Sequence, residues 1–356
     1  MKRIRVLIVD DSTLVRGHLR DILEADEGME VVGEARNGRE AVEMTRKLHP
    51  GVVTMDLEMP VMGGLEAIEE IMHSKAVPIL VVSASVSNAQ CALNAIGCGA
   101  IEVMAKPRLG SPEVADFVAK VRLLAGVSVV TRLRPRKTVG EACAPVALSM
   151  GLTALKLNQP ATGPSSYPKV FAIACSTGGP QALAQILSAL PSGFSCPVLV
   201  AQHIAVGFAA GMVEWLRGIC RLPVRLAQQG EPLQAGVIHF SPSESHLSVT
   251  PTRQMALLAR SPQDVFHPSC DVLLSSVAEV FGPQAVGIIL TGMSHDGARG
   301  LANIHEKGGM TLAQDEATSV VFGMNRVAIE SGCVRQVLPL KELAPAMVQL
   351  ANLIKR

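Results

Sequence analysis

The feature that most constrains this chain is a repeated alternation of short apolar runs with amphipathic segments. The first half of the chain contains five apolar runs that predict strands, at 5–11, 30–35, 51–57, 78–85 and 101–107. Segments with helical periodicity separate these runs, and a further one follows at 113–125. Near-continuous apolar strands that alternate with helices are typical of a parallel sheet covered on both faces.

The same alternation resumes in the second half of the chain. There we expect six strands, at 169–176, 197–203, 236–242, 285–292, 309–315 and 334–340. Between the two halves, residues 126–167 are rich in proline and small polar residues and predict a linker. The sequence therefore predicts two doubly wound α/β domains, 1–125 and 168–356.

Composition narrows the class of protein. The net charge of +1 over 356 residues gives no electrostatic reason to bind nucleic acid. No apolar run approaches the roughly 18 residues of a membrane-spanning helix, and Asp10 and Asp11 interrupt the apolar run near the N-terminus. The eight cysteines are scattered without a C-x-x-C pair, which favours reduced thiols. We expect a cytoplasmic protein that neither binds nucleic acid nor inserts into a membrane.

Charged and hydroxyl side chains gather at the ends of the predicted strands of the first domain. They are Asp10, Asp11, Asp56, Ser83 and Lys106. The carboxyl ends of parallel strands share one edge of a sheet, so these side chains should lie together. Crowded carboxylates repel one another unless a cation intervenes, and oxygen ligands with open positions suit Mg²⁺. A carboxylate beside Mg²⁺ and a lysine is suited to accept a phosphoryl group.

The stretches "VDDS", "MDLEMPVMGG", "VVSAS" and "AKP" in residues 1–107 resemble the receiver domains of response regulators. The resemblance implies a flavodoxin-like fold and phosphorylation of Asp56 by a histidine kinase. It implies that Ser83 and Lys106 contact the phosphoryl group. The implied Mg²⁺ ligands are Asp10, Asp11, Asp56 and the backbone carbonyl of Glu58. Val103 stands where many receivers carry an aromatic switch residue, so we expect any signal to travel through a loop shift led by Ser83.

A second group of chemically active residues follows three strands of the second domain. Ser176 comes after "VFAIAC", His203 after "VLVAQ", and Asp296 lies in the loop after "AVGIILTG". A serine hydroxyl needs a base within hydrogen-bond reach and a third group that orients the base, and these residue types supply all three. Two other interpretations of "STGGP" remain open, a phosphate-binding loop and an ordinary turn. The phosphate loop is disfavoured because no G-x-x-x-x-G-K-[ST] motif is present.

Other histidines compete with His203 for the role of base. His239 lies inside "VIHFSP", where packing within a strand is expected. The remaining competitors are expected in loops or helices: His246, His267, His295 and His305. His203 is favoured because its position at a strand end matches that of Ser176.

Residues 168–356 resemble the catalytic domain of the chemotaxis protein-glutamate methylesterases (CheB). The matching pieces are "IACSTGGPQAL", "VAQHIAVGF", "HFSPSESHL", "HPSCDVLLSSVA", "GIILTGMSHDGARGL" and "AQDEATSVVFGM". The resemblance implies a Rossmann-like domain with Ser176 as nucleophile, His203 as general base and acid, and Asp296 as the orienting carboxylate. Thr177 and Met293 would contact the substrate or the oxyanion. The implied reaction hydrolyses glutamate methyl esters on methyl-accepting chemoreceptors, releases methanol, needs no cofactor, and extends to deamidation of receptor glutamines.

One chain with a phosphoacceptor site and a hydrolase site suggests a switch between two domains. In this hypothesis the unphosphorylated receiver covers the edge that carries Ser176, and phosphorylation of Asp56 loosens the contact. The alternative is a receiver fused to a non-enzymatic α/β domain that binds a protein. A transcriptional regulator is disfavoured because we find no helix-turn-helix segment.

Overall fold

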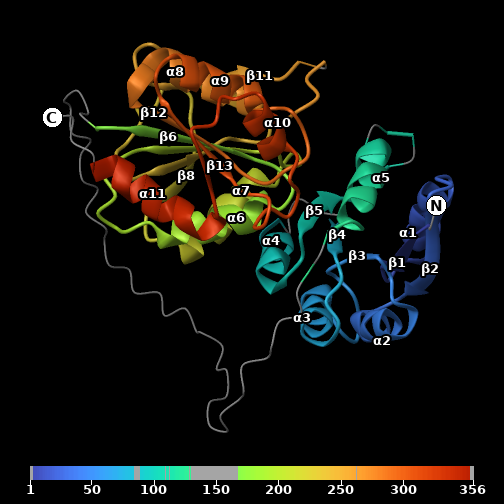
Figure 1. Cartoon of the computed structure of the whole chain (residues 1–356). Helices are drawn as coiled ribbons and strands as arrows, with labels where there is room; N and C mark the ends of the chain where they lie inside the picture. Colours follow the sequence, from blue (N-terminus) through green and yellow to red (C-terminus); the bar gives the residue numbers. More distant parts are fainter. Residues whose placement is uncertain are drawn as a thin grey trace, which may run out of the picture.

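Figure 1 shows the computed structural model of the chain. The structure describes residues 3–83, 89–108, 110–111, 113–127, 129, 167–261 and 263–352. Nearly all of the predicted linker at 126–167 lies outside these residues, as do positions 84 and 85 of the strand predicted at 78–85. Among the described helices, none is long and apolar enough to cross a membrane.

The first unit is built on a five-stranded sheet in which every pairing is parallel. Its strands are β1 (Ile4–Val9), β2 (Met29–Ala35), β3 (Val52–Met55), β4 (Ile79–Ser83) and β5 (Glu102–Ala105). Its helices are α1 (Thr13–Glu24), α2 (Gly38–Leu48), α3 (Gly64–Ser74), α4 (Ala89–Cys98) and α5 (Glu113–Leu124). The strand order β2-β1-β3-β4-β5 is that of flavodoxin-like folds.

Helices cover both faces of this sheet. Apolar side chains of α2, α3 and α4 pack on one face, and those of α1 and α5 pack on the other. Local signals begin two of the helices, because Ser12 Oγ accepts a hydrogen bond from Val15 N at 3.4 Å and Asn37 Oδ1 accepts one from Glu40 N at 3.0 Å. The predicted fold class is confirmed for this unit.

The second unit contains a seven-stranded parallel sheet, ordered β14-β13-β12-β6-β7-β9-β8. Its strands are β6 (Val170–Cys175), β7 (Val198–Gln202), β8 (Val224–Leu226), β9 (Ile238–Phe240), β12 (Ala285–Ile289), β13 (Met310–Gln314) and β14 (Gln336–Leu338). The helices that pack on one face are α6 (Gly179–Ala189), α7 (Ala209–Ile219) and α11 (Leu340–Asn352). Those on the other face are α8 (Cys270–Phe281), α9 (Ala298–Glu306) and α10 (Met324–Glu330).

Three strands of the second unit were not predicted. They are the edge strand β8 and a separate antiparallel hairpin, β10 (Ser245–Val249) with β11 (Met255–Ala259). A short 3-10 helix, Gly282–Gln284, also precedes β12. The expectation that His246 lies in a loop or helix was wrong, because it is buried on β10, where its Nε2 pairs with Asp264 Oδ2 at 2.9 Å. His239 lies buried on β9, as expected.

The two units pack against each other through α4, which lies against α6 and α7 (Figure 1). Gln181 Nε2 on α6 donates to the carbonyl of Ala100 at 2.7 Å. A Cβ placed on Gly97 would lie 3.8 Å from Nε1 of Trp215, the chain's only tryptophan. One apolar cluster runs without interruption from the side of the first sheet that carries α4 to the side of the second that carries α6 and α7. The interface is therefore part of a hydrophobic core.

Candidate functional site

The first unit gathers its carboxylates at the carboxyl ends of β1 and β3. Asp10 and Asp56 are buried, Asp11 is exposed, and ligand oxygens of the three lie within 4.8 Å of one another. Lys106 Nζ lies 2.6 Å from Asp10 Oδ2 and 3.1 Å from Asp56 Oδ2. The structure thus brings together four side chains that the sequence placed on three different strand ends.

The electrostatics of this cluster favour a bound cation. Burial raises the pKa of Asp56, the Lys106 ammonium lowers it less, and the neighbouring Asp10 raises it further. Burial lowers the pKa of Lys106, but its contacts with Asp10 and Asp56 more than offset this, so that pKa is raised. Two of the three clustered carboxylates share one lysine, and the hard oxygen donors that remain fit Mg²⁺. The residues present therefore suit the metal that a receiver is expected to use.

The other residues predicted for the receiver site lie on or near the strands of the same sheet. Ser83 is buried at the end of β4, beside Lys106, whose backbone N–H donates to the Ser83 carbonyl at 2.9 Å. Glu58 is exposed two residues after Asp56. Val103, at the position of the aromatic switch, is buried in the core on β5.

In the second unit, Ser176 follows β6 directly and precedes the turn into α6. Its backbone N–H donates to the carbonyl of Thr291, beyond the end of β12, at 3.0 Å. A Cβ placed on Gly292 would lie only 2.6 Å from Ser176 Cβ, so the segment after β12 touches the serine side chain. In the strand register Cys175 pairs with Gln202, which makes Ser176 and His203 the next residues along neighbouring strands.

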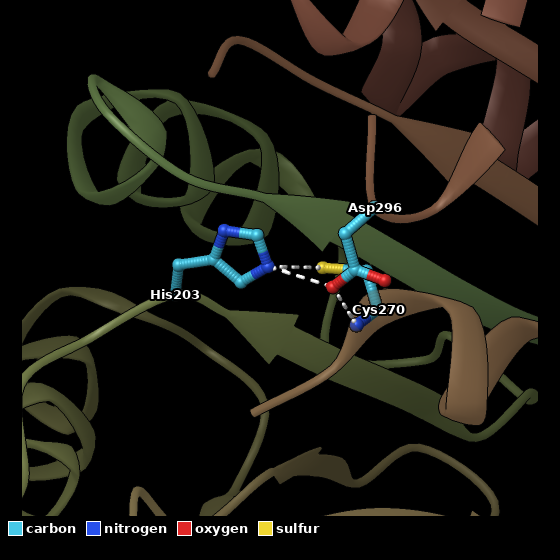
Figure 2. A group of neighbouring side chains, drawn as sticks. All are labelled: His203, Cys270 and Asp296. Atoms are coloured by element: carbon cyan, nitrogen blue, oxygen red, sulfur yellow. Dashed lines mark hydrogen bonds and ion pairs between the residues drawn. The ribbon is translucent and has the colours of Figure 1, made fainter. Parts of the chain in front are cut away.

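His203 is paired with Asp296. Its Nε2 lies 2.8 Å from Asp296 Oδ2, and Figure 2 shows Nδ1 on the side of the ring away from that carboxylate. An Nε2–H that donates to Asp296 leaves Nδ1 as the nitrogen with a free lone pair. The arrangement fixes the tautomer and gives the ring the form that a general base requires.

Asp296 is almost completely buried and is held by the N-terminus of α8. Its Oδ2 accepts a hydrogen bond from Cys270 N at 2.6 Å, and its Oδ1 accepts from Asp271 N at 2.9 Å and from Ser269 Oγ at 3.0 Å. Burial alone would raise the pKa of Asp296, but His203 and the helix N–H groups lower it overall. The carboxylate therefore stays ionised although it is buried.

Asp271 makes the reciprocal contact with the next helix. Its Oδ1 accepts hydrogen bonds from Gly297 N at 2.9 Å and Gly300 N at 2.8 Å, at the start of α9. Burial raises the pKa of Asp271, while these N–H groups oppose the shift. α8 thus begins on a carboxylate from the loop before α9, and α9 begins on a carboxylate from the first turn of α8.

Gln202 connects the backbones of the serine and the histidine. Its Nε2 donates to the carbonyls of Ser176 at 2.9 Å and of His203 at 2.8 Å. The side chain is 1% exposed, and a Cβ on Gly179 would lie 2.0 Å from its Oε1. Only glycine leaves room for the amide at this turn, so Gly179 and Gln202 fit together to set the distance between the two strand ends.

Phe266 and Cys270 complete the surroundings of His203. The Phe266 ring stacks on the imidazole with 5.3 Å between centroids and a 6° interplanar angle. Cys270 Sγ lies 3.5 Å from His203 Nε2 (Figure 2). The sequence interpretation missed both residues, together with Ser269, Asp271 and Gln202. The only available signal was the pattern Ser269 to Asp271 before an apolar run, which is typical of a helix N-terminus.

The predicted substrate-contact residues differ in accessibility. Met293 is 60% exposed, whereas Thr177 is 5% exposed. The Thr177 side chain lies beside the carboxyl of Glu102, which comes from β5 of the first unit, and opposes the rise in the pKa of that carboxyl. Burial raises the pKa of Glu102, and Lys120 Nζ lies 3.9 Å from its Oε1. The first unit therefore reaches the turn beside Ser176 with a buried carboxyl group.

Comparison with known proteins agrees with this architecture. Residues 6–114 match the response regulator receiver domain, and residues 171–347 match the CheB methylesterase family. The chain is 54% identical over 365 residues to "Protein-glutamate methylesterase/protein-glutamine glutaminase 3" of Paramagnetospirillum magneticum, covering 98% of this chain and 97% of that protein. A similarly named protein of Myxococcus xanthus is 41% identical and covers 96% of this chain and 95% of its own length.

A solved structure supports the fold of the second unit. The crystal structure of the Thermotoga maritima CheB methylesterase catalytic domain covers 52% of this chain and 100% of its own, with 31% identity and a TM-score of 0.51. The relatives span nearly the whole chain, and two family matches divide it as its two sheets do. The chain belongs to the CheB family of protein-glutamate methylesterases that carry a response-regulator receiver domain.

Proposed function

We propose that this protein removes methyl esters from glutamate side chains of methyl-accepting chemoreceptors and deamidates receptor glutamines. The names of the full-length relatives, protein-glutamate methylesterase and protein-glutamine glutaminase, support both reactions. The observation that carries the proposal is the pairing of His203 with buried Asp296 beside the strand end that bears Ser176. We divide the chain into a receiver at 1–125, a linker at 126–167 and a catalytic domain at 168–356.

The chemistry follows from the tautomer of His203. Nδ1 accepts the Ser176 proton as Oγ attacks the ester carbonyl, while Nε2–H stays bonded to Asp296. The tetrahedral intermediate collapses to an acyl-enzyme as the same proton passes to the leaving methoxide, which departs as methanol. Water, deprotonated by Nδ1, then attacks the acyl group and regenerates Ser176 with a free glutamate. A glutamine substrate follows the same path and releases ammonia.

Stabilisation of the oxyanion comes from the N-terminus of α6 and from the loop after β12. Ser176 lies one turn before α6, whose positive end favours negative charge on the attacked carbonyl. We assign Thr177 and the Met293 backbone to this oxyanion and substrate region. Thr177 can contact a substrate only when Glu102 has withdrawn from it.

The receiver supplies the control. We propose that a histidine kinase phosphorylates Asp56, with Mg²⁺ held by Asp10, Asp11, Asp56 and the Glu58 carbonyl. A bound Mg²⁺ would neutralise charge on the transferred phosphoryl oxygens. Lys106 and Ser83 then contact the phosphoryl group. Lys106 follows β5, the strand whose first residue is Glu102, so a pull on Lys106 acts on the strand that contacts the catalytic domain.

Phosphorylation thus shifts a population from docked to undocked. In the docked form α4 packs on α6 and α7, and Glu102 covers Thr177. The phosphoryl group binds Lys106 in competition with Asp10, which holds it in the unphosphorylated form. Because Lys106 has different partners in the two forms, phosphorylation can change the balance between the docked and undocked populations.

Methanol release from methylated receptor tests the hydrolase assignment. Ser176→Ala should abolish it, and exposed Ser192→Ala serves as the control that should retain it. Retention of full hydrolysis by Ser176→Ala would reject the mechanism. Full signalling output by Ser176→Ala without any hydrolysis would favour the alternative, a receiver fused to a protein-binding domain.

A further inference from the structure

Cys270 lies inside the catalytic cluster but has no part in the hydrolysis described above. It is the first residue of α8, its side chain is completely buried, and its Sγ lies 3.5 Å from both His203 Nε2 and the Ala201 carbonyl. Figure 2 shows the sulfur, the imidazole and the Asp296 carboxylate converging on one point. The ester hydrolysis needs only the last two.

The spacing of the three donor atoms suits a tetrahedral metal ion. One nitrogen, one sulfur and one oxygen all lie within 4.8 Å of one another. Zinc bonds of about 2.0–2.1 Å to nitrogen and oxygen and about 2.3 Å to sulfur, at tetrahedral angles, place N and S about 3.6 Å apart and N and O about 3.4 Å apart. The observed Nε2–Sγ separation is 3.5 Å and the Nε2–Oδ2 separation is 2.8 Å. Of these two separations, only the Nε2–Oδ2 distance has to increase.

The donor set also decides which metal fits. A thiolate, a carboxylate and a neutral imidazole carry two negative charges, which a divalent cation balances in a buried site. Thiolate and imidazole select zinc or cadmium over magnesium. The receiver cluster of Asp10, Asp11 and Asp56 has oxygen donors only and makes the opposite selection.

We propose that His203, Cys270 and Asp296 form an inhibitory site for zinc-class divalent metals. When the metal binds, the Cys270 S–H proton leaves to solvent and the sulfur becomes a ligand. His203 binds through Nε2, so its proton moves from Nε2 to Nδ1, and its hydrogen bond to Asp296 is replaced by two metal bonds. Nδ1 then has no free lone pair for the Ser176 proton, and the enzyme is inactive. The inhibition rests on the proposed role of His203, whereas the metal binding does not.

Binding of the metal must depend on pH. The buried thiol binds a metal as the thiolate, so its proton leaves when the metal binds. One proton is released for each metal bound. The apparent affinity should therefore rise about tenfold for each unit of pH.

The test uses the full-length protein with buffered free Zn²⁺, and Co²⁺ as a spectroscopic probe. The wild type should bind one equivalent and lose methanol release at least tenfold, with full recovery on addition of a chelator. Its Co²⁺ form should show thiolate charge-transfer absorption and tetrahedral d–d bands. Cys270→Ala and the conservative Cys270→Ser should raise the inhibitory Zn²⁺ concentration at least about 100-fold relative to each variant's own metal-free activity. Half-buried Cys220→Ser is the matched control and should behave like the wild type.

Two results would overturn the proposal. One is Zn²⁺ sensitivity in Cys270→Ala equal to that of the wild type. The other is a wild-type Co²⁺ spectrum without a thiolate band. If the wild type showed no esterase activity at all, the proposed function would fail, but the stoichiometry and the Co²⁺ spectra of wild type and variants would still decide the metal site.

Discussion

The two sites of this protein occupy equivalent places in their sheets and have opposite electrostatics. Both lie at the carboxyl ends of parallel strands. In the receiver, burial raises the pKa of Asp56, and Asp10 and Asp56 share Lys106. In the catalytic domain, the hydrogen bonds of Asp296 are satisfied by backbone N–H groups and Ser269, and its pKa is lowered.

The difference shows what each site is built to do. A cluster with surplus negative charge favours a cation and, through it, a phosphoryl group. A carboxylate fixed by helix N–H groups and a serine hydroxyl favours a single orientation of its histidine partner. The same position at the carboxyl ends of parallel strands therefore supports two kinds of site. The receiver site is completed by its ligands, whereas the catalytic site is already assembled without them.

The largest effect should come from breaking the preassembled site. Asp296→Asn should lower kcat for methanol release by about 10³- to 10⁴-fold, because an amide no longer selects the Nε2–H tautomer of His203. The comparison variant is Asp264→Asn, which disrupts a second His–Asp pair, His246–Asp264, connected to the site through the hydrogen bond from Ser269 N to His246 Nδ1. Steady-state kinetics on methylated receptor would decide. Equal losses in the two variants would show that the effect is structural.

Removing the phosphoacceptor should abolish control by the receiver and leave the catalytic site intact. Asp56→Asn should lose all stimulation by a small-molecule phosphodonor while its basal methanol release stays within about twofold of the wild type. Chelation of Mg²⁺ should have the same effect on the wild type. Fluorescence of Trp215, the single tryptophan beside α4, should change on phosphorylation of the wild type and stay constant in the variant. Stimulation of the variant would contradict the control model.

Gln202→Leu should cause a smaller loss of kcat. This variant tests whether the catalytic residues are positioned before the substrate binds. The carbonyls of Ser176 and His203 would lose their shared donor, at a cost of roughly 1–3 kcal/mol of folding stability for each group left unsatisfied. We expect kcat to fall about tenfold with KM little changed, because positioning is lost rather than binding. Buried Thr311→Val, which breaks a hydrogen bond to Cys333 O, should lower the melting temperature without lowering kcat. An unchanged kcat in Gln202→Leu would deny the residue a positioning role.

The smallest effect concerns the contact between the two units, where Glu102 of the receiver lies beside Thr177. Burial raises the pKa of Glu102 above its ordinary value of 4.5 in the docked form, so docking takes up a proton. Docking should therefore strengthen as pH falls through that raised pKa and weaken as pH rises through it. Trp215 fluorescence should report a few-fold change in the docked population for the wild type and a flatter profile for Glu102→Gln. A wild-type profile as flat as that of the variant would show that Glu102 stays ionised when docked.

Strand-end residues could be predicted because parallel topology alone brings them to one edge. Lys106 contacts Asp10 and Asp56 for this reason, and Ser176 adjoins His203 in the register. The fold class followed from the apolar strands in the same way. These inferences need the order of the elements and no knowledge of how the loops pack.

Contacts between loops and helix ends could not be predicted. Cys270 reaches His203 across 67 residues because α8 begins on Asp296, and Phe266 stacks on the imidazole from the segment before that helix. The hairpin that carries His246 was missed because its two short strands, of five residues each, show little apolar alternation. The contacts of Cys270 and Phe266 and the position of the hairpin all depend on tertiary packing, which no local sequence pattern encodes.

The carboxylates of Asp296 and Asp271, which bind the N-termini of α8 and α9, affect how the sequence of this enzyme can evolve. Catalytic groups commonly reduce the stability of the proteins that carry them, so sequences drift away from them when selection for activity relaxes. Asp296 is instead a structural cap of α8, and Asp271 is the corresponding cap of α9. A chain that lost its esterase function would still be held to an aspartate at this position by the requirement to fold. The carboxylate of the triad should therefore outlast the serine in descendants that no longer hydrolyse anything.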